Sequence, residues 1–204
     1  MARVTILLEG YVKNDGENVQ STISLVQDGE TNIVIDPGMA KDFNDVIRSL
    51  SKVDIKPEDI GYVFLTHHHP DHTINTAKFP KAKVIDYNSI YEGDIWLDTG
   101  GEYQLTPNVR IVPTPGHTKE DATLFVTNVT NVENNKDVTV AICHLWWFEG
   151  KQHDPLAEDY KELLSSRIKI LKVANYIVPG HGAIFKNNKI QSYYRSPTVQ
   201  TVNQ

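Results

Sequence analysis

Cysteine is nearly absent from this chain, and long apolar runs are absent altogether. Cys143 is the only cysteine among 204 residues, so no disulfide can form within the chain, and a reducing cytoplasm is the natural setting. No stretch approaches the roughly 20 apolar residues of a membrane-spanning helix. The first apolar run is broken at Glu9, which is too early for a signal-peptide core. We therefore expect a cytoplasmic protein with no membrane partner.

An excess of positive charge is also lacking. The chain carries 20 Lys and Arg against 26 Asp and Glu, a formal charge of −6, and shows no basic stripe. General binding of nucleic acid needs such a stripe, so nucleic acid is an unfavoured partner, although a phosphoester held by metal ions stays open as a substrate. The length and the ordinary hydrophobic content of 40% predict a single domain over residues 1–204.

Apolar patterning predicts strands in two runs, each followed by a helix. Strands are expected at 4–8, 22–26, 32–35, 62–65, 83–86, 102–105, 109–112, 122–127, 137–142 and 176–178. Helices are expected at 43–50, at 73–79 and from an Asp154-Pro155 start through Lys172, and loops at 10–18 and 91–101. This order predicts an α/β sandwich of two sheets with helices outside and ligands at strand ends along one edge.

Four histidines and a carboxylate are concentrated in the segment 66–72, which has the sequence THHHPDH and directly follows the apolar run 62–65. If that strand continued to His69, the side chains of His67 and His69 would share one face and His68 would point away. Imidazole and carboxylate groups so close together predict a metal site for one ion or two.

Two more histidines, His117 and His181, each follow a Pro-Gly turn. With His67, His69, Asp71 and His72 they make six donor groups. Six donors suffice for two zinc-type sites with three protein ligands each, and such sites keep a position open for water.

These motifs resemble those of the metallo-β-lactamase superfamily. Segment 66–72 is similar to its T-H-x-H-x-D-H signature, segment 114–118 (TPGHT) resembles its T-P-G-H-T turn, and segment 178–182 (VPGHG) resembles its closing P-G-H-G. The segment Asp36-Pro37-Gly38 resembles the aspartate, followed by glycine, that this superfamily has at the end of an early strand. The resemblance extends from Val4 to Phe185. Within the superfamily, the chain is most similar to small single-domain members related to lactonases and hydroxyacylglutathione hydrolases.

The resemblance implies an αβ/βα sandwich of two mixed sheets, with helices on the outer faces and the metals at one edge. It implies one metal held by His67, His69 and His117, and a second held by Asp71, His72 and His181. It implies that Asp36 orients a ligand or its water from behind. Two zinc ions are the implied cofactor, with one iron ion as the alternative.

The sequence departs from this family where an aspartate usually bridges both metals, after the strand at 138–142. Aligning on the leucine and aromatic residues that follow places His144 there, and a shift of one residue would place Cys143 there as a thiolate ligand. A neutral imidazole offers one in-plane lone pair, so it binds one metal and does not bridge two. We expect a weakened second site, two metals bridged only by hydroxide, or loss of the second metal.

The function that follows is metal-dependent hydrolysis of a small-molecule ester, lactone, thioester or phosphoester. A bound cation lowers the pKa of water from about 15.7 to about 7, so that a metal-bound hydroxide can attack. Asp71 is expected to orient the nucleophile and to shuttle a proton.

The residues beside His144 are candidates for the pocket wall, namely Cys143, Trp146 and Trp147. The same aromatic cluster and the segment after Phe185 would also suit a contact in a homo-oligomer. Three alternative functions stay open: a mononuclear iron oxygenase of the persulfide dioxygenase kind, a small metallo-ribonuclease or phosphodiesterase, and a metal-binding relative with weak turnover or none.

Overall fold

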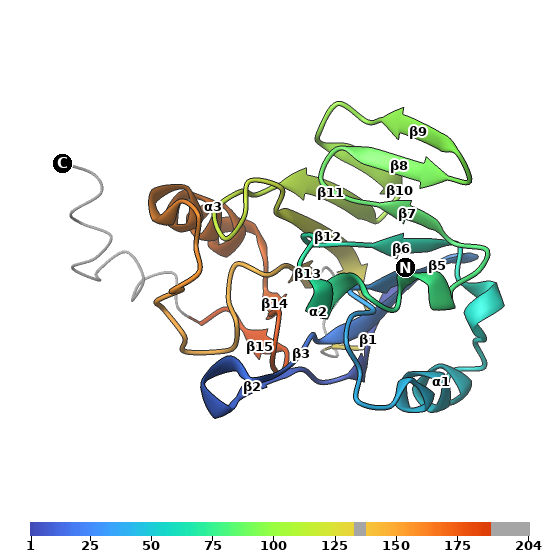
Figure 1. The fold of residues 1–204 in the computed structure, drawn as a ribbon. Coiled ribbons are helices and arrows are strands. Elements are labelled where there is room, and N and C mark those ends of the chain that lie inside the picture. Colours follow the sequence, from blue (N-terminus) through green and yellow to red (C-terminus); the bar gives the residue numbers. More distant parts are fainter. Residues whose placement is uncertain (133–137, 189–204) are drawn as a thin grey trace.

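The computed structural model of the protein describes residues 1–132 and 138–188 (Figure 1). The strands of the first half are β1 (Ala2–Leu8), β2 (Tyr11–Lys13), β3 (Asn18–Gln20), β4 (Ile23–Asp28), β5 (Thr31–Ile35), β6 (Tyr62–Phe64), β7 (Lys83–Ile85), β8 (Ser89–Glu92) and β9 (Ile95–Asp98). Those of the second half are β10 (Tyr103–Thr106), β11 (Val109–Pro113), β12 (Ala122–Val129), β13 (Val138–Ile142), β14 (Tyr176–Val178) and β15 (Phe185–Lys186). The α-helices are α1 (Phe43–Ser51), α2 (Pro70–Thr73) and α3 (Tyr160–Val173), and short 3-10 helices lie at Asn14–Gly16, Pro57–Asp59 and Thr76–Lys78.

The strands form two mixed ladders that are joined at one point. Within the described residues the pairing order is β15-β14-β13-β12-β1-β4-β5-β6-β7-β8-β9, with β10 and β11 added beside β12. Among the described residues, the strand pairing between the two ladders is a single parallel pair, Ala2 opposite Val129. The β2–β3 hairpin stands apart from both.

The apolar core has three layers, which follow from the alternation of side chains on the strands. The middle layer joins the two ladders, with Ile33 and Phe64 from one and Leu124 and Val140 from the other. An outer layer packs α1 on the first ladder, and another packs α3 on the second. Figure 1 shows α1 and α3 on opposite sides of the strands. The predicted αβ/βα sandwich with helices on its outer faces is confirmed.

The helix α1 shows why the sequence forms these outer layers. Asp42 caps its start by accepting a hydrogen bond from the backbone N–H of Asn44 at 2.9 Å. Val46 and Leu50, four residues apart, are its buried side chains, so one face packs on the sheet.

Two expected loops contain strands. Residues 91–101 contain the second half of a hairpin, because Gly93-Asp94 forms a two-residue turn in which Gly93 adopts a positive φ of 62° and lets β9 pair with β8. Residues 10–18 contain β2 and the start of β3, and the 3-10 helix Asn14–Gly16 connects these two strands.

The helix expected from Asp154 begins later, at Tyr160, and Asp159 is its N-cap. The carboxylate of Asp154 is turned toward a histidine instead, as described below. Among the described residues, no helix has the length and apolar character needed to cross a membrane. The segment after Phe185, considered for an oligomer contact, lies mostly outside the described residues.

Candidate metal centre

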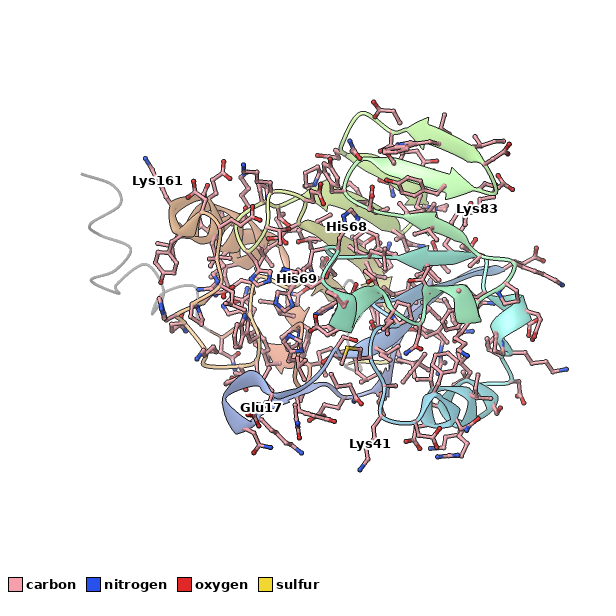
Figure 2. All side chains as sticks on the ribbon, in the orientation of Figure 1. Glu17, Lys41, His68, His69, Lys83 and Lys161 are labelled. Carbon is pink, nitrogen blue, oxygen red and sulfur yellow. The ribbon has the colours of Figure 1, made fainter. Side chains whose placement is uncertain are left out.

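The histidine cluster lies on a loop and a short helix. β6 ends at Phe64, so the expected strand through His69 is absent, and Pro70 begins α2 as its first residue. His67 and His69 still converge, because the loop turns both rings to the same side. His68 points away, as expected, and its ring lies between Glu120 at 2.6 Å and Asp86 at 3.2 Å. Figure 2 shows the side chains of His68 and His69 diverging from adjacent positions.

Three ring nitrogens define a first group of donors. Nδ1 of His69 lies 3.0 Å from Nε2 of His67 and 3.1 Å from Nε2 of His117. Ligands at 2.0–2.1 Å from a tetrahedral zinc ion stand about 3.3 Å apart. The spacing of these nitrogens therefore suits one shared cation.

A second group lies beside the first, around the carboxylate of Asp71. Oδ2 of Asp71 is 3.5 Å from Nε2 of His72 and 3.6 Å from Nε2 of His181. Nε2 of His72 is buried and has no hydrogen-bond partner among the described residues. A buried nitrogen without a partner is costly, and a cation at this point would satisfy it.

Asp36 supports a histidine of each group, one through a direct hydrogen bond and one through Thr66. Its Oδ2 accepts a hydrogen bond at 2.8 Å from Nδ1 of His72 and another at 2.7 Å from the hydroxyl of Thr66. Oγ1 of Thr66 in turn lies 3.1 Å from Nδ1 of His67. A hydrogen bond at one ring nitrogen fixes the tautomer and aims the other nitrogen, so these contacts direct Nε2 of both rings inward.

The two histidines from Pro-Gly turns are supported in the same way. Nδ1 of His117 lies 2.8 Å from Oδ2 of Asp154, and Nδ1 of His181 lies 3.0 Å from the backbone oxygen of Gln20. The sequence does not reveal this role of Asp154, because an Asp-Pro pair before an apolar stripe is also typical of a helix start.

His144 lies between the two groups. Its ring centroid is 4.3–4.4 Å from those of His117 and His67, and 4.7–4.9 Å from those of His72 and His181. One of its ring nitrogens can complete a ligand set with His67 and His117, or with His72 and His181, since the donors in each set lie within 4.8 Å of one another. This is the central position that the alignment assigned to it.

His144 differs from the rings of His67, His72, His117 and His181, each of which has a hydrogen-bonding contact at Nδ1. Its Nδ1 is buried without a hydrogen-bond partner among the described residues. The backbone of Gly180 lies against this edge of the ring, where an added Cβ would be 2.0 Å from Nδ1. Only glycine at position 180 leaves room for the ring.

Burial favours the neutral form of four of the clustered imidazoles, which is the form that binds metal. Burial, together with the neighbouring histidines, holds the pKa of His67 and of His144 well below the usual value, and the pKa of His69 and of His181 is lowered chiefly for the same reason. Since a metal ligand must be a neutral imidazole, these four rings need not lose protons near pH 7 to bind a metal ion.

The donors open onto a cavity of about 150 Å³. Its lining combines five donor residues with an apolar wall of Val12, Val19, Trp147 and Leu156. Of the three residues beside His144 that were candidates for the wall, Trp147 lines this cavity.

Trp146 and Cys143 are not in the pocket wall. Both are buried in the outer layer against α3, where Arg167 lies over the Trp146 ring at 5.3 Å. Burial raises the pKa of the Cys143 thiol to about 12, which disfavours a thiolate. Because successive side chains at the strand end point to opposite sides, His144 reaches the cluster and Cys143 does not.

Comparison with known proteins agrees with this architecture. The model of the metallo-beta-lactamase superfamily matches residues 16–146. Metallo-beta-lactamase domain-containing protein 1 of Xenopus laevis is 30% identical over 194 residues, which cover 90% of this chain and 81% of that protein. The chain belongs to the metallo-beta-lactamase superfamily, a superfamily of metal-dependent hydrolases.

Other relatives are less similar to this chain than the Xenopus laevis protein, or are longer than it is. An uncharacterised Caenorhabditis elegans protein is 30% identical over 83% of this chain, which spans about half (49%) of that protein. An N-acyl homoserine lactonase of Bacillus thuringiensis is 25% identical over 62% of this chain and 56% of its own length. A Thermotoga maritima structure assigned to the metallo-beta-lactamases superposes with a TM-score of 0.68 at 20% identity, covering 91% of this chain and 99% of the other.

The contact between Gly180 and His144 gives a first prediction. Gly180→Ala should lower the free energy of unfolding of the metal-free protein by roughly 1–3 kcal/mol, because the new methyl group overlaps the imidazole. In a His144→Ala background, the same change should cost much less, which urea unfolding of all four proteins measures. An equal loss in both backgrounds would show that the ring does not lie against Gly180.

Proposed function

We propose that the protein is a zinc-dependent hydrolase that cleaves an uncharged ester or lactone of a small molecule. One observation carries the proposal: donors from two adjacent groups line a cavity whose other side chains are apolar. The B. thuringiensis relative is an N-acyl homoserine lactonase, which supports the same class of reaction.

The donors fit two metal ions of the zinc type. His67, His69 and His117 would hold one ion, and Asp71, His72 and His181 the other, with His144 available to either. Ions held there would supply an activated water near neutral pH and would polarise the substrate oxygen.

The chain itself supplies orientation and proton transfer. The Asp71 carboxylate faces the cavity with its side chain 16% exposed, so it is accessible to a water or a leaving group. It would orient the attacking water and carry a proton to the departing oxygen. Trp147, Leu156, Val12 and Val19 would hold the apolar part of the substrate and exclude water around the reacting carbon.

The character of the wall favours an uncharged substrate over a phosphodiester. None of the described residues that line the cavity is Lys or Arg. Lys151 lies over the ring of Trp147 at 5.4 Å without being part of the lining. A phosphodiester would gain no cationic side chain from this wall, whereas an acyl chain or lactone ring gains apolar contact.

A mononuclear iron oxygenase is the weaker alternative. Non-haem iron of that kind typically binds two histidines and one carboxylate. The first group offers only imidazoles, and its central neighbour His144 adds another. An all-imidazole group suits zinc better.

The proposal predicts metal-dependent turnover with a defined substrate preference. Zinc-loaded protein should hydrolyse aryl esters and N-acyl lactones, a chelator should abolish the activity, and bis-aryl phosphodiesters should be cleaved at least about a hundredfold more slowly. His67→Ala should remove most of the activity, because one donor is lost, whereas the adjacent control His68→Ala should retain it. Initial rates on this panel measure both effects. Preferred cleavage of the phosphodiester, or equal loss in both variants, would contradict the proposal.

The central histidine gives a further prediction. His144→Asp should raise both the affinity for the second ion and the hydrolytic rate, because a carboxylate can bridge two ions and adds a negative charge. We expect a gain of at least about tenfold, since even an outer partner of a ligand is worth about 10–100-fold in metal affinity.

His153→Asp is the matched control, because His153 is exposed and its ring packs on Tyr160 outside the cluster. Zinc titration and turnover of both variants measure the effect. Unchanged zinc binding and rate in His144→Asp would remove His144 from the central position.

A further inference from the structure

Asp154 is a buried carboxylate that the proposed reaction does not yet use. Its side chain is fully buried, 0% exposed, and the His117 side chain beside it is 1% exposed. Oδ2 lies 2.8 Å from Nδ1 of His117, and Oδ1 accepts a hydrogen bond at 3.0 Å from the backbone N–H of Leu156. A charge buried this deeply is tolerated only when it is paired, so the Asp154 carboxylate depends on its contact with His117.

The segment that carries Asp154 also fixes the backbone of the His117 turn. The N–H of Glu158 donates to the backbone oxygen of His117 at 3.0 Å, and the N–H of Asp159 donates to that of Gly116 at 3.1 Å. The N–H of His117 itself donates to Asp121 at 2.7 Å. Separate hydrogen bonds therefore fix the ring and the backbone of His117.

The first donor group has no carboxylate of its own. Asp71 belongs to the second group, and Asp36 contacts His72 directly but reaches His67 only through Thr66. Asp154 is the one carboxylate among the described residues whose oxygen directly contacts a ring of the first group. It therefore matches, for His117, the role that Asp36 has for His72.

We propose that Asp154 is a positioning residue that makes the first donor group a tight metal site. By accepting a hydrogen bond from Nδ1–H of His117, the carboxylate leaves the Nε2 lone pair directed at His69 and increases the basicity of the ring. It also brings a negative charge to a group of otherwise neutral ligands. The inference rests on the proposed function only in taking the first group to be a metal site.

The test compares zinc affinities and does not depend on turnover. Asp154→Asn keeps an oxygen that accepts the hydrogen bond but removes the charge. Competition titration should show that the ion lost in His67→Ala binds about 10–100-fold more weakly in Asp154→Asn, while the other ion is unaffected.

Asp159→Asn is the control, because it removes the same charge from the same segment. The exposed Asp159 caps α3 by accepting from the N–H of Glu162, and asparagine caps equally well. Urea unfolding of the metal-free variants separates a general loss of stability from a loss of zinc affinity. Equal zinc affinity in Asp154→Asn and Asp159→Asn would overturn the proposal.

A second measurement uses the wild-type protein alone. In zinc-loaded wild-type protein, long-range proton–nitrogen NMR spectra should show His117 protonated at Nδ1, with Nε2 as the ligand. Protonation at Nε2 would overturn the inference. Binding of no zinc by the wild-type protein would contradict the proposed function itself, so the two failures are distinguishable.

Discussion

Six imidazoles and one carboxylate direct their donor atoms into one small volume, and the rest of the structure holds them there. The six rings are those of His67, His69, His72, His117, His144 and His181. Burial lowers the pKa of four of these rings, those of His67, His69, His144 and His181, and leaves Nε2 of His72 and Nδ1 of His144 without a hydrogen-bond partner among the described residues. A cation is the partner that removes this conflict, which is why the cluster is best explained as a metal centre.

The two ladders of the sandwich make this arrangement rigid. One ladder provides the loop that carries His67, His69 and His72, and the other provides the turns of His117, His144 and His181. The turn of His181 is tied across the interface, because the backbone N–H of Thr22 donates to the oxygen of Gly180 at 2.7 Å. The site therefore forms only when both ladders have packed, and neither half holds the full donor set.

Much of this organisation could be predicted from the sequence, because short motifs with strict chemistry carry it. The HxHxDH spacing, the two Pro-Gly-His turns and the apolar periodicity were sufficient for the sandwich and for the converging donors. The sequence could not show that Asp154 turns its carboxylate to His117 instead of capping a helix, since both outcomes satisfy an Asp-Pro pair. Nor could it show that Trp147 lines the cavity while Trp146 packs on α3, because the irregular loop after β13 sets their directions.

The central claim is that the two donor groups bind two metal ions, and that His144 coordinates one of them through a single ring nitrogen. The most direct test is the identity and number of metal ions in protein purified without added metal, measured by elemental analysis and by native mass spectrometry during zinc titration. The account predicts zinc, with a second ion that binds more weakly than the first and brings the total to two per chain. Iron alone at one ion per chain, or no bound metal even in excess zinc, would contradict it.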